Sequence, residues 1–308
     1  MARGGRAVGV LLALVLVALV GCRSGVTRPY ATSTERPGRP KVMLVVEENR
    51  SYGEIIGSAE APYLNRLAST YGLATAFGAG YPTHCPSLPA YLLLTSGSRH
   101  GICDDEDAEH HRVRGPNVFA QVAASGRQWR GYAQSMPTPC DRSDAGTYVV
   151  RHAPAPYYVT AQDHCAQWDV PMGTRLSGAL HTDVTHGRLP AFSFVTPDVC
   201  HEMHGGVGCF GDDVEHGDQW LHDWLPMVLD GPDYRSGKLT VITTWDEGSK
   251  ESNHVPAIVV SPRSGHIRSA GHFTHCSVLR TIEELLALPP LGCARTAASM
   301  RSAFRLTA

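Results

Sequence analysis

The chain has 308 residues, of which 43% are apolar and 18% are charged, and its formal net charge is −2. This composition is typical of a folded globular protein and excludes a largely disordered chain. The near-neutral balance also argues against nucleic-acid binding, which usually requires a strongly basic face.

The N-terminus has the pattern of an export signal. Arg3 and Arg6 precede residues 8–20, which are apolar apart from Gly9 and too few for the roughly 20 residues that span a bilayer. The run ends in Gly21-Cys22, which resembles the bacterial lipoprotein cleavage box. In such proteins the cysteine becomes the first mature residue and carries diacylglycerol. We therefore predict a lipoprotein signal peptide and lipobox over residues 1–22, with an ordinary signal peptide as the alternative.

The rest of the chain divides into a linker and one domain. Residues 23–40 are rich in Pro, Ser, Thr and Arg and are predicted to form a flexible tether between lipid and domain. Residues 41–308 are predicted to form a single catalytic domain. The expected location is the extracellular face of a bacterial cell envelope, either lipid-anchored or secreted.

The cysteine count fits an oxidising compartment. Nine cysteines are present, and eight remain if Cys22 is acylated. An even number in an exported protein predicts up to four disulfides, whose pairing one sequence does not determine. Cys200 with Cys209 closes a short loop, and Cys103 with Cys140 is a plausible second bridge. A metal–thiolate site is disfavoured because no C-x-x-C pair occurs.

Alternating buried strands and amphipathic helices predict the fold class. Continuous apolar, β-rich runs at residues 42–46, 191–195, 239–243 and 257–260 are typical of strands buried on both faces. Apolar residues recur at helical spacing over residues 61–71, 214–229 and 277–288. This order predicts an α/β protein, a three-layer α/β/α sandwich around a mostly parallel sheet.

Three of the predicted strands end in polar groups. The first runs into Glu47-Glu48-Asn49, the second into Thr196-Pro197-Asp198, and the third into Trp245-Asp246-Glu247. Ligands bind at the carboxyl ends of strands in open parallel sheets, so these groups are expected to meet there. Glu48, Asn49, Asp246 and Glu247 offer the oxygen ligands that a divalent metal ion prefers. The alternative for either acidic pair is a solvated loop.

Ser87 is the candidate nucleophile. Residues 88–94 predict a short helix that stops near Gly97, so Ser87 would lie at its N-terminus, where free N–H groups favour an anion. A serine there can attack phosphorus if a metal lowers the pKa of its hydroxyl. The alternative is that Ser87 only caps the helix, and Thr83 is a rival hydroxyl.

Several of the 16 histidines are candidates for phosphate binding or proton transfer. His152 and His204 lie in predicted loops, where functional groups concentrate. His84, His254 and His275 are further candidates. The acidic run at residues 103–111 is predicted to be a solvated loop rather than a metal site.

Several motifs in collinear order resemble a bacterial phosphoesterase family that includes secreted acid phosphatases and phospholipases C. They are Glu48-Asn49-Arg50-Ser51, Thr83-His84 with Pro86-Ser87-x-Pro89-x-Tyr91, Arg151-His152-x-Pro154, Phe194-Val195-x-Pro197, Met203-His204, Gly217-Asp218-x-Trp220-Leu221, Thr244-Trp245-Asp246-Glu247, Asn253-His254-Val255-Pro256 and His275-x-x-Val278-Leu279-x-Thr281-Ile282-Glu283. The likeness covers nearly all of residues 41–291 and is strongest to small secreted acid phosphatases, including those that hydrolyse phosphatidylinositol 3-phosphate.

The resemblance implies an alkaline-phosphatase-like fold and a role for each matching residue. Ser87 becomes the nucleophile of a phosphoserine intermediate, and His152, His204 and His84 become phosphate-binding or proton-transferring groups. Glu48, Asn49, Asp246 and Glu247 become residues of the metal site. Two positions depart from the family pattern: Ala90 replaces an Asn, and Glu247 stands where some members carry Asp. Tyr91 stands where a sulfatase would carry Arg, which disfavours sulfate esters.

The resulting hypothesis is a metal-dependent acid phosphatase that acts on a small phosphate ester or a phosphoinositide. The first alternative is a phospholipase C-type phosphodiesterase acting on phospholipids. The second is a non-catalytic envelope lipoprotein that retains the fold and only binds its ligand.

Overall fold

The centre of the computed structural model is an eight-stranded sheet. The structure describes residues 1–2, 4, 38–249 and 253–307, so Cys22, the rest of the predicted leader and most of the tether lie outside the described residues. The strand order is β4-β3-β5-β1-β6-β7-β2-β8. The strands are β1 Lys41–Glu47, β2 Gly72–Gly78, β3 Trp129–Ala133, β4 Asp169–Pro171, β5 Phe192–Thr196, β6 Leu239–Trp245, β7 Ala257–Val260 and β8 Arg268–Thr274.

The pairing makes the sheet mostly parallel, as predicted. β1 lies between β5 and β6 and runs parallel to both, with Val42 opposite Phe192 and Glu47 opposite Trp245. Among the strands of the described residues, β7 alone is antiparallel to its neighbours, β6 and β2. The carboxyl ends of β1, β5 and β6 therefore meet at one edge of the sheet, where the polar residues that follow them lie together.

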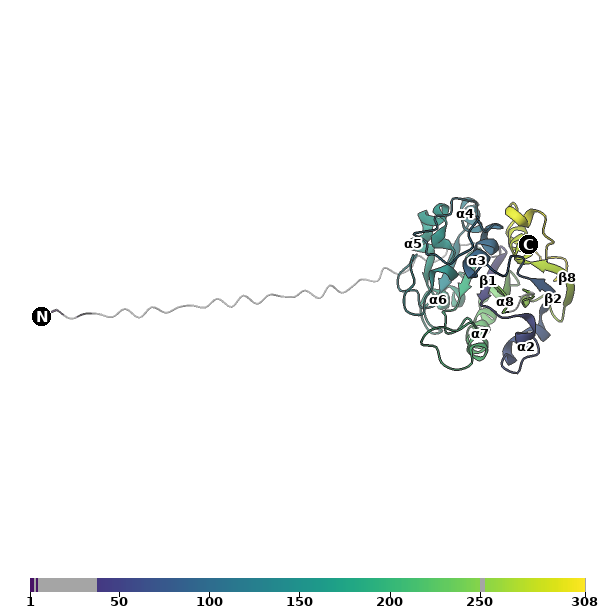
Figure 1. Cartoon of the computed structure of the whole chain (residues 1–308), viewed down its shortest axis with the longest axis horizontal. Helices are drawn as coiled ribbons and strands as arrows, with labels where there is room; N and C mark the ends of the chain where they lie inside the picture. Colours follow the sequence, from purple (N-terminus) through teal and green to yellow (C-terminus); the bar gives the residue numbers. More distant parts are fainter. Residues whose placement is uncertain (3, 5–37, 250–252, 308) are drawn as a thin grey trace.

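Helices cover both faces of the sheet. They are α1 Tyr52–Ile55, α2 Pro62–Thr70, α3 Ser87–Ser96, α4 Val118–Ala124, α5 Gln162–Trp168, α6 Ala179–Thr185, α7 Asp213–Asp230, α8 Pro232–Arg235 and α9 His275–Leu286, with short 3-10 turns at Val150–His152, Ala155–Tyr157, Val159–Ala161 and Gly292–Arg295. α3 packs against α4 and α9, whereas α7 packs against α2, α6 and α8. In Figure 1, α4 lies towards the top of the molecule and α2 and α7 towards the bottom, with β2 and β8 at one side. The predicted three-layer sandwich is confirmed.

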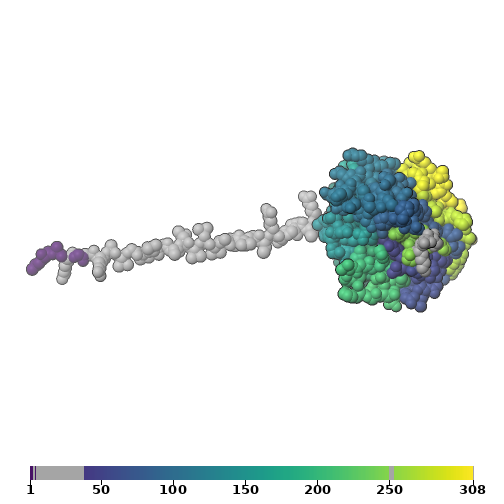
Figure 2. All heavy atoms as spheres, viewed as in Figure 1, coloured from purple at the N-terminus to yellow at the C-terminus, as the bar shows by residue number. Residues whose placement is uncertain are grey.

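The sequence pattern explains these layers. All seven residues of β1 are buried, which accounts for its unbroken apolar run. α7 begins at Asp212, whose carboxylate accepts hydrogen bonds from the N–H groups of Val214 and Glu215, and it buries Trp220 and Trp224 on one face. The space-filling view shows the domain packed as one body in which early, middle and late segments of the chain adjoin (Figure 2).

Four disulfides form, as the cysteine count predicted, and Cys200 pairs with Cys209 as expected. The bridge predicted between Cys103 and Cys140 is wrong. Cys103 pairs with Cys85, because α3 ends at Gly97 in the left-handed conformation and the following loop returns to the start of the same helix. Cys140 pairs with Cys165, because its N–H donates to the carbonyl of Asp169 directly after α5.

The disulfides bear on where the protein works. Four bridges in one domain are consistent with an extracytoplasmic location. Among the residues that the structure describes, no helix combines the length and the apolar character needed to cross a bilayer.

Candidate active site

Ser87 is the first residue of α3, and its hydroxyl does not cap the helix. Pro86 occupies the N-cap position, and the Ser87 hydroxyl donates a hydrogen bond to Glu48 Oε2 at 2.9 Å. The free N–H of Leu88 is instead satisfied by Asp105 Oδ1 at 2.9 Å. Asp105 belongs to the acidic run at residues 103–111, which thus contacts the start of α3. Ser87 is only 5% exposed, so its hydroxyl is directed into a buried polar cluster.

Glu48 is the centre of that cluster. It follows the last residue of β1 and is fully buried. Its Oε1 atom accepts a hydrogen bond from the Tyr91 hydroxyl at 2.6 Å, while Oε2 accepts from Ser87. Burial raises the pKa of Glu48 well above its usual value, and the nearby carboxylates of Asp246 and Glu202 raise it further.

Asn49 and Asp246 join the ends of β1 and β6. The Asn49 N–H donates to Asp246 Oδ1 at 3.0 Å, and Asn49 adopts a left-handed conformation (φ 44°), which asparagine tolerates well. Asp246 is fully buried, and burial together with the Glu247 charge raises its pKa well above the usual range. The polar groups that follow β1 and β6 therefore converge, whereas Asp198 after β5 accepts hydrogen bonds from Ser135 and Thr147 instead.

Glu247 lies at the margin of the cluster. Its Oε2 atom accepts a hydrogen bond from the Tyr81 hydroxyl at 2.9 Å. It is near enough to Asp246 to raise the pKa of that carboxyl, and burial raises its own pKa. Its partner in the structure is a tyrosine rather than Ser87 or Asn49.

His152 and His204 approach the cluster from two loops. His152 is buried, with Nδ1 2.7 Å from Glu202 Oε2 and Nε2 3.5 Å from Glu48 Oε1, although the ring is not aligned for hydrogen bonds. Its ring stacks on that of Tyr91, with centroids 5.1 Å apart. His204 Nδ1 lies 3.2 Å from the Asn49 side-chain amide, and burial lowers the pKa of His204.

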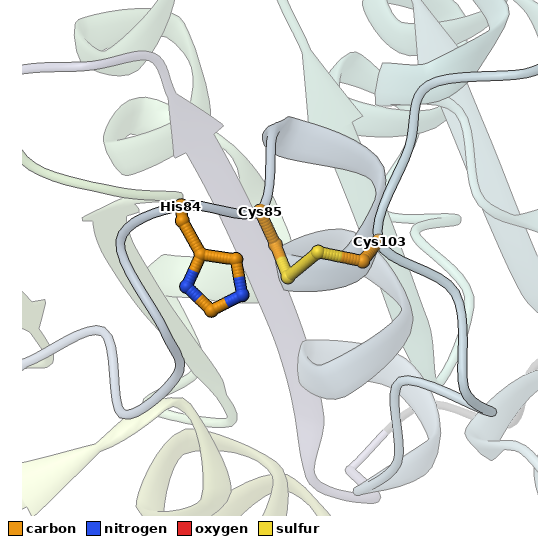
Figure 3. Close-up of side chains that lie close together, drawn as sticks. All are labelled: His84, Cys85 and Cys103. Carbon is orange, nitrogen blue, oxygen red and sulfur yellow. A yellow bond between two sulfur atoms is a disulfide. The ribbon is translucent and has the colours of Figure 1, made fainter.

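His84 stays outside this cluster. Its side chain is exposed, and a ring nitrogen lies within 4.8 Å of the sulfurs of Cys85 and Cys103. Figure 3 shows the ring beside the bond between those two sulfurs. Because both sulfurs are consumed in the disulfide, they are not available as thiolate ligands, and this trio is not a metal site.

The oxygen atoms around Asn49 fit a divalent cation. The two ends of the Asn49 amide are interchangeable by rotation. One orientation turns its N–H₂ group towards Asp246 Oδ1 at 3.0 Å and Glu48 Oε2 at 3.2 Å, which satisfies all partners without a metal. The other turns the amide oxygen towards the same two carboxylate oxygens, which is favourable around a cation or where one of the two carboxyls is protonated. Within the described residues no ion pair joins a lysine or arginine to Glu48 or Asp246, so a divalent ion bound between these oxygens would supply the positive charge that their ionised forms lack.

Sequence reasoning missed two residues of the cluster, Tyr91 and Glu202. Glu202 follows β5, and its carboxylate lies within 4.8 Å of ligand atoms of Glu48 and His204. Its position between His201 and His204, after a buried strand, was the available signal. Tyr91 was noted only as the residue that disfavours a sulfatase. Ala90, which replaces the family Asn, is buried in a small apolar cluster with Tyr81, Cys85 and Leu93.

Known proteins resemble this chain in sequence and in fold. Residues 58–289 match the model of the phosphoesterase family. The chain is 30% identical over 299 residues to a phosphatidylinositol-3-phosphatase of Mycobacterium tuberculosis, covering 94% of this chain and 90% of that one. It is 22% identical over 244 residues to an acid phosphatase of Aspergillus fumigatus, covering 73% of this chain and 51% of that one. It thus spans about half of the fungal relative.

Solved structures match at the level of the fold. A protein of the alkaline phosphatase superfamily from Vibrio parahaemolyticus superposes with a TM-score of 0.58 at 11% identity, covering 89% of this chain and 73% of that one. A lipoteichoic acid synthase of Listeria monocytogenes gives a TM-score of 0.53 at 11% identity, with coverages of 81% and 72%.

The sheet order and the two helical layers give the chain the fold of the alkaline phosphatase superfamily protein that it superposes on. The chain belongs to the phosphoesterase family and is a hydrolase that acts on phosphoric ester bonds.

Proposed function

We propose that this protein is a metal-dependent phosphatase that hydrolyses phosphate monoesters outside the cytoplasm through a phosphoserine at Ser87. The observation that carries the proposal is the hydrogen bond from the buried Ser87 hydroxyl to Glu48, beside the contact between Asn49 and Asp246. The named activities of the relatives, a phosphatidylinositol-3-phosphatase and an acid phosphatase, support a monoester substrate. The phosphatidylinositol-3-phosphatase is matched over most of its length, and its name suggests a phosphoinositide as the substrate class.

The chain's own residues suit this reaction. Glu48, Asn49 and Asp246 would hold the divalent cation, and Glu247 would support Asp246. Bound there, the metal would lower the pKa of the Ser87 hydroxyl and offset negative charge on the phosphate. Glu48 holds the Ser87 hydroxyl in place through its Oε2 atom, and Tyr91 fixes the other oxygen of Glu48.

The two histidines supply the remaining functions. Burial favours the neutral form of His204, which lies next to Asn49 at the entrance of the cluster. We assign it the transfer of a proton to the leaving alkoxide, a role that requires the protonated ring and therefore acid solution. His152 lies deeper, between Glu48 and Glu202, and is assigned to phosphate binding and to positioning of Glu48.

Ser87→Ala is the direct test. Turnover of p-nitrophenyl phosphate should fall on the order of 10³-fold or more, because the attacking oxygen is lost. Thr83→Ala is the matched control, since Thr83 is exposed and four residues away, and its turnover should stay within about twofold. Near-normal activity of Ser87→Ala would refute the nucleophile, and loss in Thr83→Ala alone would transfer that role to Thr83.

Metal dependence is tested on the wild-type protein. Dialysis against a chelator should abolish turnover, and one or more divalent ions should restore it. Metal should also raise the melting temperature, since a ligand that binds only the folded state at 100 times its Kd stabilises that state by about 2.7 kcal/mol. Full activity and an unchanged melting temperature after chelation would contradict the proposed metal site.

We further propose that the domain is tethered to the outer face of the membrane through Cys22 and residues 23–40. The signal-like N-terminus and the four disulfides support an extracytoplasmic location. Radiolabelled palmitate should be incorporated into the wild-type chain and not into Cys22→Ser.

A further inference from the structure

Two large apolar side chains are highly exposed on the loop that follows His204. Val207 is 103% exposed and Phe210 is 86% exposed. Among the described residues, the other large apolar side chains with such exposure are Met1 and Leu176. A single exposed apolar residue is ordinary, but a pair three residues apart on one loop calls for a partner.

The loop that carries this pair is held against the site. It also carries His204, whose ring contacts the Asn49 amide. Gly205 packs so closely on the Asp213 carboxylate that a Cβ atom there would lie 2.5 Å from Asp213 Oδ1. Asp213 in turn lies 3.7 Å from the Arg50 guanidinium, next to Asn49. Val207 and Phe210 therefore lie on a loop whose two ends, at His204 and Asp213, border the carboxylate cluster.

The same loop is covalently constrained. The Cys200–Cys209 disulfide closes it, and the N–H of Cys209 donates to the carbonyl of Gly206 at 3.1 Å. These links restrict how far the loop can fold back to bury its apolar tip, so exposure is built into the fold. Val207 and Phe210 form the apolar tip of this loop. Contact with an apolar partner during catalysis would remove their surface from water, which is favourable.

We propose that Val207 and Phe210 insert into the lipid surface that presents the phosphate-ester substrate. The inference rests on the proposed function, because it takes the phosphate to be carried by a lipid. The partner is identified as lipid by the apolar tip of the loop that borders the site and by the predicted acyl anchor at Cys22. The residues that follow the tip, Asp212 and Glu215, are acidic and do not attract an anionic surface, so we take the contact to be mainly apolar.

The predicted tether permits this orientation. β1 begins at the edge of the sheet opposite to the site, so the tether joins the domain far from the loop. Residues 23–40 can span at most roughly 60 Å, well over twice the length of a seven-residue strand, which is about 23 Å. A domain anchored in this way can still turn the site towards the lipid that holds it.

The test compares Val207→Ser/Phe210→Ser with Leu176→Ser, all in the full chain carrying Cys22→Ser so that an acyl group does not mask the contact. Leu176 is 81% exposed on another loop, whose neighbour Arg175 lies 4.0 Å from Asp223 in the middle of α7. The first readout is turnover of p-nitrophenyl phosphate in solution. The others use phosphatidylcholine vesicles that contain phosphatidylinositol 3-phosphate, and measure how much protein sediments with the vesicles and how fast it hydrolyses their phosphoinositide.

The double variant should keep soluble turnover within about twofold and should lose vesicle binding and vesicle turnover on the order of 100-fold. Leu176→Ser should match the parent in every assay, and binding by the parent should persist at about 1 M salt. Equal sedimentation of double variant and parent, or an equal loss in Leu176→Ser, would overturn the inference. So would conversion of a dimer to a monomer without loss of vesicle binding, since the tip would then be a protein interface.

Failure of the proposed function gives a different pattern. If the parent hydrolyses neither substrate, the phosphatase assignment fails, and vesicle sedimentation still decides whether the tip contacts lipid.

Discussion

Glu48 is held between two hydroxyl groups that reach it from the same helix. Ser87 and Tyr91, one turn apart on α3, donate to its two carboxylate oxygens at 2.9 and 2.6 Å. A residue proposed as a metal ligand thus has one oxygen shared with the proposed nucleophile and the other fixed by a buried tyrosine. The tyrosine matters because partners that orient a ligand tune both metal affinity and activity.

Tyr91→Phe should therefore weaken the site without removing a proposed ligand. The apparent affinity for the activating metal should fall about 10- to 100-fold, because Glu48 loses the donor that orients it. The stability should fall by about 1–3 kcal/mol, since a buried acceptor is left without its hydrogen bond. Activity measured across a metal titration, together with chemical unfolding, checks both numbers.

Tyr157→Phe is the control for Tyr91→Phe. Tyr157 is also buried and also donates a hydrogen bond, but to the carbonyl of Glu106 at 3.1 Å. It should lose stability and keep the metal dependence of the wild type. If the metal dependence of Tyr91→Phe equals that of the wild type, Tyr91 does not orient Glu48 and only fills space.

At the scale of elements, α3 and the segment before it place the nucleophile. The helix is buried along its whole length, ends at Gly97, and is linked at its start by the Cys85–Cys103 disulfide. Gly97 has a φ of 69°, and a Cβ there would lie 2.7 Å from the Leu291 carbonyl oxygen, so another residue would be strained. Ser87 is thus positioned by the packing of a short helix and by one bridge.

Removing the Cys85–Cys103 disulfide should lower both the unfolding free energy and the turnover number, for different reasons. In Cys85→Ser/Cys103→Ser the unfolding free energy should fall by about 3 kcal/mol, the size expected for a loop of this length. The value of kcat should fall as well, because Cys85 lies two residues before Ser87 and its constraint is lost. Unfolding curves and steady-state kinetics on the same preparations measure the two effects.

The Cys276–Cys293 bridge provides the comparison. Its sequence separation is 17, against 18 for Cys85–Cys103, so the chain entropy released on removal is nearly the same. Cys276→Ser/Cys293→Ser should lose similar stability with a smaller change in kcat. An equal fall in kcat for both pairs would mean that the kinetic effect comes from general loosening.

Strands could be predicted from the sequence where the residues of the strand itself show its burial. The strands β1, β5 and β6 were predicted because both of their faces are buried and each is a continuous apolar run. β2 and β8 were not, because β2 mixes small residues with Leu73 and Phe77 between two glycines, and β8 is a largely exposed edge strand. The link from Tyr91 to Glu48 spans 43 residues, and the return of Cys103 to Cys85 depends on how α3 ends. Neither follows from spacing alone.

At the scale of the whole molecule, buried charge shapes the response to pH. Asp169 in β4 is 2% exposed, its Oδ2 atom has no hydrogen-bond partner, and its carboxyl packs on Gly131 in β3. Burial alone raises the pKa of Asp169 to about 7. It lies three strands away from β1, so its protonation bears on the stability of the fold rather than on the proposed chemistry.

The direction of the effect follows from which state holds the proton. Below about pH 3 the carboxyl is largely neutral in both folded and unfolded chains. Between about pH 4 and pH 7 the unfolded chain releases the proton while the folded chain keeps it, so the folded state loses stability as pH rises. A shift of this size corresponds to a loss on the order of 4 kcal/mol once the pH exceeds 7. Asp169 therefore favours a protein that is more stable in acid than at neutral pH.

Asp169→Asn should remove this dependence, because the amide has nearly the same shape and does not ionise. Urea unfolding with disulfides intact should find the variant clearly more stable than wild type at about pH 8 and nearly equal to it at about pH 4. Asp163→Asn removes the same charge from an exposed position on α5 and should change stability little at either pH. A variant that is destabilised equally at both pH values would show that Asp169 contributes no pH-dependent stability over this range, so that acid stability would have to come from other buried carboxyls.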